Sequence, residues 1–167
     1  MDVRAATTPA DLDEARRLFR AFVSWHRERH VDDRDLIDAY FDDAAFEREL
    51  AGLPGAYAEP DGSLLLAWED DRALGCVASR RLADATCEMK RMFVDPAGRH
   101  RGVGTALGEA VVAQARSAGY RAMYLDTSVR QGEAMALYRR LGFVEVEPYY
   151  ALPPPLRDWL VFFRLAW

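Results

Sequence analysis

The segment that decides the fold, residues 88–105, reads EMKRMFVDPAGRHRGVGT. An apolar strand ends at Val94, a basic loop follows, and a helical pattern begins near Gly102. The first N–H groups of a helix have no partners within the helix and carry partial positive charge. Because Gly102 and Gly104 remove side chains at this point, a phosphate can approach those N–H groups closely. The segment therefore predicts a turn that binds a pyrophosphate.

Two common phosphate-binding loops do not fit the segment. The dinucleotide fingerprint requires a third glycine, which Gly102-Val103-Gly104-Thr105-Ala106-Leu107 lacks, and the P-loop requires a lysine after a glycine. The remaining pattern is R-x-x-G-x-G, in which Arg99 and Arg101 add charge and hydrogen-bond donors at the rim. Taken alone, the pattern also fits an arginine-rich surface turn before a helix.

The order of the expected elements indicates a mixed sheet. Helices and strands neither alternate regularly nor separate into blocks, so a purely parallel or purely antiparallel sheet is not expected. The strand–helix–strand unit over 87–126 predicts a right-handed crossover between neighbouring parallel strands. In the first half of the chain we expect a strand over 2–7, a helix capped by Thr8, a helix over 34–51, and strands over 64–69, 72–81 and 87–94. In the second half we expect a helix from Gly102 to Ser117, a strand over 120–126, a helix over 132–141, and strands over 143–146 and 160–167. The loop at Pro153-Pro154-Pro155 separates the last two strands.

Composition narrows the classes of function. The 167 residues suffice for one domain, residues 1–167, with one sizeable core. A net charge of −5 argues against nucleic acid or an anionic membrane as the main partner. No apolar run approaches the length of a membrane span and no signal peptide is recognised, so we expect a cytoplasmic protein.

The expected strand register does not place Cys76 opposite Cys87, so both are predicted to be reduced thiols.

Two segments together resemble a known family. Residues 88–96 resemble the central strand of the GNAT superfamily of acyl-CoA-dependent N-acetyltransferases. Residues 134–143, AMALYRRLGF, are similar to its second signature helix, with the pattern A-x-x-L-Y-x-x-x-G-F. The resemblance implies an α+β, three-layer GNAT fold: a mixed, mostly antiparallel sheet of about seven strands, helices on both faces, and two central parallel strands that splay apart.

The resemblance also implies a donor and its binding residues. Acetyl-CoA is the expected acyl donor, with its pyrophosphate on the main-chain N–H groups of the turn and its pantetheine beside the central strand. One main-chain amide of that strand is expected to polarise the thioester carbonyl. The expected cofactor-binding residues are Met92, Phe93, Val94, Arg99, His100, Arg101, Gly102, Val103, Gly104 and Thr105.

By the same resemblance, Glu88 and Tyr138 are candidate catalytic residues. Glu88 stands where several family members carry the general base that removes a proton from the amine, and it would act through water or with a pKa raised by burial. Alternatively, it anchors the strand or binds the amine. Its strand neighbours Lys90, Met92 and Val94 share its face only if no bulge interrupts the strand. Tyr138 stands where many members protonate the departing sulfur; alternatively, it is a packing residue.

The acceptor is expected to be a primary amine of a small molecule or peptide, acetylated by direct attack on the thioester. The alternative is a non-catalytic module of the same fold that binds acyl-CoA.

The acidic residues over 32–49 are interpreted mainly as a solvated helix face, with attraction of a cationic amine as the other interpretation. No histidine pair has metal-ligand spacing, so no metal is predicted. Many family members form homodimers, and no sequence feature specifies how this chain would do so.

Overall fold

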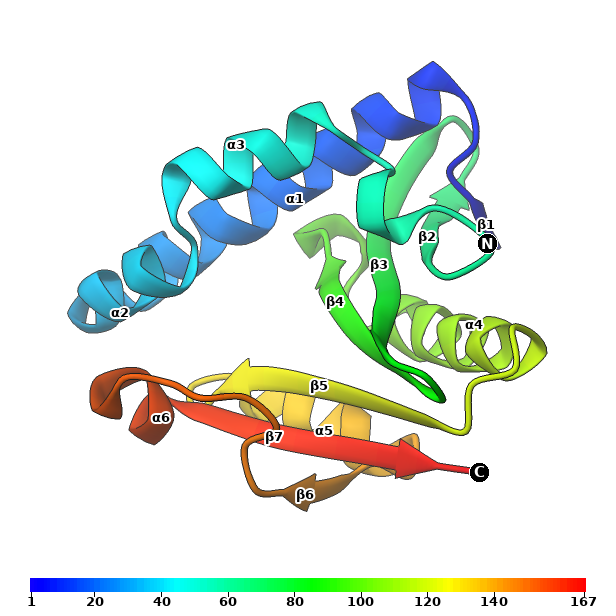
Figure 1. Ribbon diagram of the computed structural model, residues 1–167. Helices are drawn as coiled ribbons and strands as arrows, with labels where there is room; N and C mark the ends of the chain where they lie inside the picture. The colour runs from blue at the N-terminus through cyan, green and yellow to red at the C-terminus, as the bar shows by residue number, and fades with distance from the viewer.

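A computed structural model describes residues 1–167 as a seven-stranded sheet with helices on both faces (Figure 1). The strands are β1 (Asp2–Ala5), β2 (Ser63–Glu69), β3 (Arg72–Ala83), β4 (Thr86–Val94), β5 (Ala122–Ser128), β6 (Val144–Val146) and β7 (Leu160–Ala166). The helices are α1 (Pro9–Arg29), α2 (Arg34–Tyr40), α3 (Asp43–Ala51), α4 (Val103–Ser117), α5 (Gly132–Arg140) and α6 (Pro154–Trp159).

Helix α1 begins where the sequence predicts. The Thr8 hydroxyl accepts the Asp11 N–H at 3.1 Å, and an Asp11 carboxylate oxygen accepts the Thr8 N–H at 3.0 Å. This reciprocal pair satisfies two N–H groups that the first helical turn leaves unpaired. Backbone hydrogen bonds to Asp11 lower the pKa of its carboxyl despite partial burial, so the carboxylate stays charged beside the positive end of the helix.

Two expectations about helices were wrong. The single helix expected over 34–51 is two helices, α2 and α3, because Asp42 caps a new helix by accepting the Ala45 N–H at 2.8 Å. The helix α6 forms where only a proline loop was expected, since prolines within the first turn need no N–H donor there. The Asp42 cap and the prolines at the start of α6 are local features that a count of apolar positions does not detect.

The sheet has the order β1-β2-β3-β4-β5-β7-β6, and only the β4–β5 pair is parallel. That pair confirms the crossover predicted over 87–126. The ladder joins only Thr86–Glu88 to Ala122–Tyr124, so the two strands separate beyond Glu88. Figure 1 shows this as a divergence of β4 from the layer formed by β5, β7 and β6. The expected splay is therefore present.

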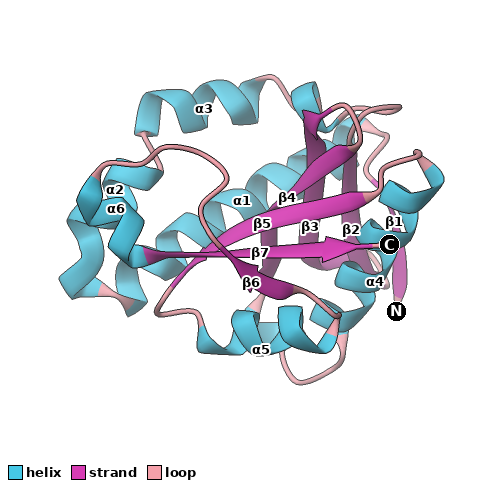
Figure 2. Ribbon diagram, turned by 60° about the horizontal axis from the view of Figure 1, so that its bottom comes forward, coloured by secondary structure: helices cyan, strands magenta, loops and turns pink.

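Two separate apolar clusters fill the two faces of the sheet. One lies under α1, α2, α3 and α6 and includes Phe19, Phe41 and Phe93. The other lies under α4 and α5 and includes Leu107 and Phe163. Figure 2 shows the sheet between these helical layers, with α1 and α3 on one side and α5 on the other. The structure has the three-layer, mixed architecture expected of the GNAT fold.

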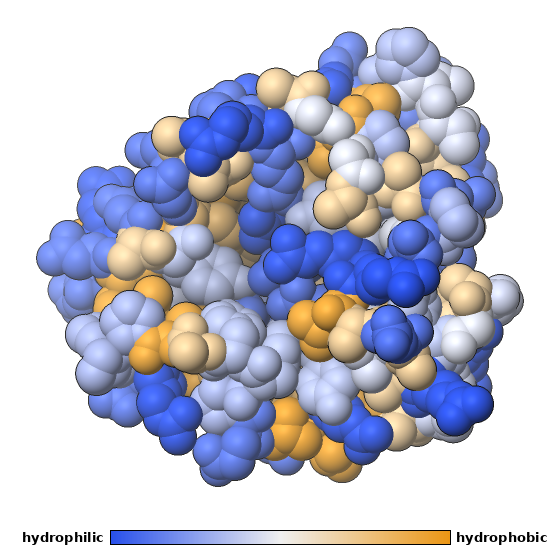
Figure 3. Space-filling model, viewed as in Figure 1, coloured by the Kyte–Doolittle hydropathy of each residue, from blue (hydrophilic) through white to orange (hydrophobic).

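Surface features agree with the composition. Hydrophilic side chains predominate on the face seen in Figure 3, and hydrophobic ones occur there in small groups. No helix reaches both the length and the apolar character that crossing a membrane requires. The two cysteines are free and buried, and the β3–β4 register pairs Cys76 with Phe93 and Cys87 with Arg81. Burial raises the pKa of each thiol to about 12, so neither is a thiolate at neutral pH.

Candidate active site

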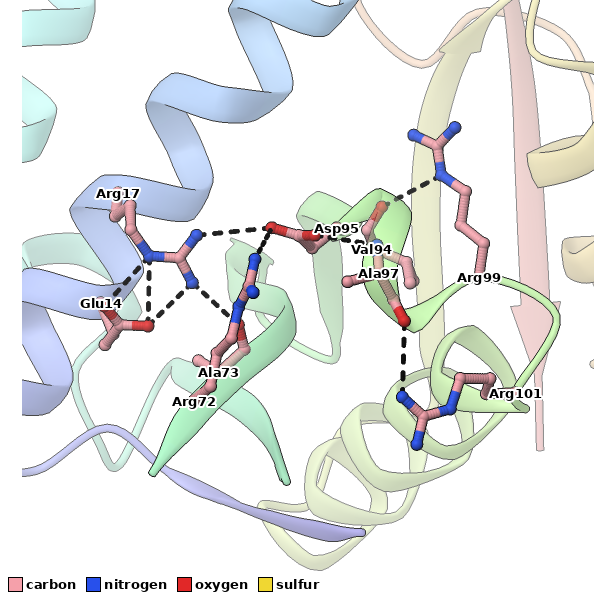
Figure 4. Close-up of polar contacts among 9 residues, drawn as sticks. All are labelled: Glu14, Arg17, Arg72, Ala73, Val94, Asp95, Ala97, Arg99 and Arg101. Carbon is pink, nitrogen blue, oxygen red and sulfur yellow. Dashed lines mark hydrogen bonds and ion pairs between the residues drawn. The ribbon is translucent and has the colours of Figure 1, made fainter. Parts of the chain in front are cut away.

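The loop between β4 and α4 is held in place by Asp95. Its carboxylate accepts the Ala97 N–H at 2.9 Å and lies 3.4 Å from the guanidinium groups of Arg17 and Arg72 (Figure 4). Burial acts to raise the pKa of Asp95, but the Ala97 hydrogen bond and the two arginine charges outweigh it and lower the pKa. Asp95 thus fixes the start of the loop against α1 and β3.

The helix N-terminus that follows is open. Gly102 has a φ of +78° and provides no side-chain cap, and a left-handed φ of this kind favours glycine. The Ala106 N–H is bonded to the Gly102 carbonyl at 3.0 Å. The N–H groups of Val103, Gly104 and Thr105 precede this bond, in the turn where helical N–H groups lack partners. These groups are available to an anion.

The two arginines of the loop point in different directions. Figure 4 shows Arg99 and Arg101 on opposite sides of the loop. Arg99 donates from Nε to the Val94 carbonyl at 3.4 Å and lies 4.8 Å from the centre of the Trp25 ring. Arg101 pairs with Glu69 and the Ala97 carbonyl, so only its main chain, and not its side chain, belongs to the turn.

A groove of about 1200 Å³, part of it open to solvent, runs along this turn. It lies between β4, the α4 N-terminus and α5, and Phe22 and Trp25 of α1 form one wall. Nine of the ten residues expected to bind the cofactor line it; Arg101 is the exception. The nine are Met92, Phe93, Val94, Arg99, His100, Gly102, Val103, Gly104 and Thr105.

A β-bulge interrupts β4 beside the groove. Arg91 and Met92 together oppose the single residue Val77, and Arg91 has a φ of +56°. An extra residue of this kind reverses the alternation of side chains along a strand. As a result, Met92 packs on the α4–α5 side, whereas Lys90, before the bulge, contacts Tyr40 of α2 on the other side. The shared face that a regular strand would give to Glu88 and Met92 does not exist.

The groove continues into a cleft between the splayed strands. The cleft has an empty volume of about 600 Å³ including open solvent, and Phe22, Met92, Gln131 and Ala134 line both cavities. Tyr138 of α5 lines the cleft and is buried. Burial raises the pKa of its hydroxyl well above the ordinary value, and the Asp126 carboxylate raises it further. The phenol therefore keeps its proton at neutral pH.

Glu88 lies behind the cleft rather than on its wall. Its carboxylate accepts hydrogen bonds from Arg80 Nε at 2.9 Å and from the Tyr149 hydroxyl at 2.7 Å. Lys90 Nζ lies 3.6 Å from Oε1, and the Glu88 side chain is 3% exposed. Any contact between Glu88 and a molecule in the cleft must therefore pass through Lys90, Tyr149 or a water.

Asp126 of β5 is the carboxylate on the cleft wall, and no motif in the sequence marks it. Tyr40 and Tyr150 donate their hydroxyls to its two oxygens at 2.5 Å and 2.6 Å. Lys90 Nζ lies 3.7 Å from Asp126 Oδ2 and donates to the Tyr40 hydroxyl at 3.0 Å. Lys90, the only lysine of the chain, thus lies between the two carboxylates. These contacts join residues from four distant segments, which explains why no local motif marks them.

His26 is a second residue of the cleft without an assigned role. It is buried, packs on Phe22 and Phe41, and lies 3.3 Å from the Gln131 amide nitrogen. Burial, with a smaller contribution from the charge of His30, lowers its pKa to about 4. The imidazole is therefore neutral at pH 7.

Most of the acidic cluster over 32–49 is engaged in pairs within the protein. Asp38 and Asp43 pair with Arg27, and Glu47 pairs with Arg20. Glu49 accepts two hydrogen bonds from Arg91, at 3.0 Å and 2.6 Å. The first three carboxylates hold α1, α2 and α3 together, Glu49 ties α3 to β4, and none of the four lines the cleft.

The profile of the acetyltransferase (GNAT) family matches residues 13–143. This chain belongs to the GNAT family. An uncharacterized N-acetyltransferase of Schizosaccharomyces pombe is 32% identical over 157 residues, which cover 93% of this chain and 90% of that protein. An N-acetylaspartate synthetase of Homo sapiens is 34% identical over 129 residues, which cover 75% of this chain and 42% of that protein.

The fold of the GNAT family extends over the whole chain. The N-acetyltransferase PaiA of Thermoplasma acidophilum, solved in complex with coenzyme A, superposes with a TM-score of 0.75 and covers 100% of both chains at 15% identity. This likeness concerns the fold. Together with the family match and the named relatives, it makes the chain a GNAT acyltransferase and confirms the resemblance drawn from residues 88–96 and 134–143.

Proposed function

We propose that this GNAT enzyme transfers an acetyl group from acetyl-CoA to a primary amine of a small molecule or peptide, by direct attack of the amine on the thioester. The observation that carries the proposal is the connection between the groove at the open N-terminus of α4 and the cleft that contains Tyr138. An acyl-CoA in the groove would present its thioester where an amine can enter from the cleft.

The donor would be held mainly by the main chain. Pyrophosphate oxygens would accept hydrogen bonds from the N–H groups of Val103, Gly104 and Thr105, where the helix dipole favours negative charge. The pantetheine would lie along Met92 and Val94, and one of their main-chain amides would polarise the thioester carbonyl. Arg99, which rests on the Val94 carbonyl at 3.4 Å, would turn toward the phosphates.

Tyr138 is the proposed acid for the departing sulfur. Tyr138 lines the cleft, and the raised pKa of its hydroxyl keeps the proton in place until the thiolate forms. Glu88 is the proposed base for the amine. Because Lys90 Nζ lies between Glu88 and the cleft at 3.6 Å from the carboxylate, Glu88 would act through Lys90 or a water rather than by direct contact.

Tyr138→Phe tests the proposed acid. Loss of a positioned acid is expected to lower kcat about 100-fold, while the affinity for coenzyme A stays unchanged. Free thiol release from acetyl-CoA, followed across a panel of amines, measures the first quantity, and calorimetric titration measures the second. Tyr120→Phe is the matched control, because the Tyr120 hydroxyl donates to the Asp61 carbonyl at 2.7 Å, away from the cleft. A Tyr138→Phe enzyme with unchanged kcat would show that Tyr138 only packs.

Glu88→Gln tests the proposed base in the same assay. A lower kcat with intact coenzyme A binding supports the role of a base. An unchanged kcat together with lower thermal stability would identify Glu88 as an anchor of β4. Tight binding of acetyl-CoA with no thiol release for any amine would instead identify a non-catalytic module that binds acyl-CoA.

A further inference from the structure

We propose that Asp126 binds the ammonium group of the acceptor and takes its first proton, and that the acceptor is a primary amine on an apolar or aromatic carbon chain without a neighbouring carboxylate. The inference rests on the proposed acetyl transfer and identifies the class of acceptor. Three observations carry it: the place of Asp126, its unused hydrogen-bonding capacity, and the side chains around it.

Asp126 is the only carboxylate that lines the cleft. Glu88 and Glu49 lie on the same side of the sheet, but the first is bonded to Arg80 and Tyr149 and the second to Arg91 and Tyr57. Neither reaches the cleft wall. An ammonium group that enters beside Tyr138 therefore meets Asp126 before any other anion.

The Asp126 carboxylate has capacity left for a cation. A carboxylate offers about four lone-pair sites, and the protein fills two of them with the hydroxyls of Tyr40 and Tyr150. Lys90 Nζ, at 3.7 Å, is too far for a hydrogen bond. The side chain is 2% exposed. Because the ion pair with Lys90 includes no hydrogen bond, a cation that bonds directly to this buried carboxylate is still favoured. Tyr150, which is 37% exposed on a surface loop, can also yield its place to a stronger donor.

The walls of the cleft specify the rest of the acceptor. Aromatic side chains line the cleft together with Asp126, among them Phe22, Tyr40, Phe41 and Trp159. The two cations of the cleft are already engaged: Arg91 with Glu49, and Lys90 with Tyr40 and the two carboxylates. A carboxylate on the acceptor would find no free cation and would lie near Asp126, which is unfavourable.

The reaction then balances within the cleft. The ammonium gives one proton to Asp126, and the nitrogen lone pair forms the C–N bond at the thioester carbon. As the C–S bond breaks, Tyr138 gives its hydroxyl proton to the sulfur and regains a proton from the nitrogen. Asp126 then passes this proton by way of Lys90 to Glu88, the base proposed above, which releases it to solvent.

The first test compares acceptors with the wild-type enzyme. Phenethylamine and phenylalanine differ only by the carboxylate beside the amine, so phenethylamine should show a kcat/KM higher by about tenfold or more. Aspartate, the acceptor class that the name of the human relative suggests, should be poorer than both. Equal or better turnover of phenylalanine or aspartate would overturn the proposal without the use of any variant.

The second test separates recognition of the ammonium from the chemistry. Hydroxylamine is neutral at pH 7 and needs no ammonium site, whereas phenethylamine is cationic. Asp126→Asn should raise the KM for phenethylamine about 10- to 100-fold and leave transfer to hydroxylamine nearly unchanged. Glu88→Gln, the matched carboxylate outside the cleft, should raise that KM much less.

The outcomes distinguish this inference from the function on which it rests. If the wild-type enzyme binds acetyl-CoA but releases no thiol with any amine of the panel, the proposed function fails. If it acetylates other amines but not phenethylamine, only the inference fails. If it acetylates both, and Asp126→Asn affects neither or affects both equally, Asp126 does not bind the ammonium and only the inference fails. Coenzyme A affinity and thermal unfolding show whether each variant is folded. If a variant is unfolded, the comparison of phenethylamine with phenylalanine in the wild-type enzyme still tests the inference.

Discussion

Burial has opposite effects on the protonation of two side chains in the cleft. Tyr138 and His26 both lie on its wall, and burial opposes the charged form of each side chain. For Tyr138 the consequence is a retained proton, and for His26 it is the loss of one. The cleft thus holds a neutral phenol and a neutral imidazole beside a carboxylate whose nearest cation, Lys90 Nζ, lies 3.7 Å away.

His26 makes stability depend on pH in a definite direction. Its pKa falls from 6.5 in the unfolded chain to about 4 in the folded one, so below pH 6.5 the unfolded state binds more protons. Stability should fall as pH drops from about 6.5 to about 4, by about 3 kcal/mol from this residue.

Denaturant unfolding at several pH values measures this contribution. His26→Phe removes the titrating group and should flatten the loss of stability in that window, whereas His100→Gln, at an exposed position, should not. The same pH slope in wild type and His26→Phe would show that burial does not hold the imidazole neutral.

At the scale of elements, the turn before α4 combines an unusual backbone with an open helix end. Gly102 and Gly119 stand at opposite ends of α4, with φ of +78° and +90°, and a Cβ at either would meet no atom within 4 Å. Alanine in a left-handed conformation costs about 1–2 kcal/mol. The two positions therefore differ in location but not in strain.

This pair allows a controlled prediction about the turn. Gly102→Ala and Gly119→Ala should each lower the free energy of unfolding by about 1–2 kcal/mol. Only Gly102→Ala should also weaken coenzyme A binding, because its methyl group and the altered backbone lie beside the proposed phosphate site. Calorimetric titration checks this, and equal affinities in the two variants would place the phosphates elsewhere.

At the scale of the whole molecule, the cleft exists because two layers meet only briefly. The β4–β5 ladder ends at Glu88 and Tyr124, so other contacts must connect the layers across the opening. One such link is Asp33, which accepts hydrogen bonds from Arg130 Nε at 2.7 Å and Trp159 Nε1 at 3.1 Å. The Arg130 hydrogen bond is the largest cause of the lowered pKa of Asp33.

Asp33→Ala should therefore destabilise the protein. The substitution leaves the buried indole N–H of Trp159 without its partner, which costs about 1–3 kcal/mol. Asp32→Ala, at the neighbouring exposed position, should change the free energy of unfolding much less. Denaturant unfolding of both variants tests the link, and equal losses would show that Asp33 does not connect the layers.

The sequence by itself determined the features that depend on neighbouring residues. The α1 capping box, the glycine-rich helix start and the crossover between β4 and β5 all follow from spacing within short segments, and the structure agrees with each. The family followed from residues 88–96 and 134–143 for the same reason. The separation of α2 from α3 was also a local effect, but apolar periodicity obscured the Asp42 cap.

Only the tertiary structure decided which side chains face the cleft. Tyr40 and Asp126 are 86 residues apart in sequence and share a hydrogen bond, so no local pattern could pair them. The bulge at Arg91 then moved Met92 to the face opposite Glu88 and Lys90, which precede the bulge. A bulge arises from how two strands fit across a sheet, and one extra residue reverses every side chain beyond it. For this reason the glycine-rich turn before α4 could be predicted from the sequence, whereas the carboxylate on the cleft wall could not.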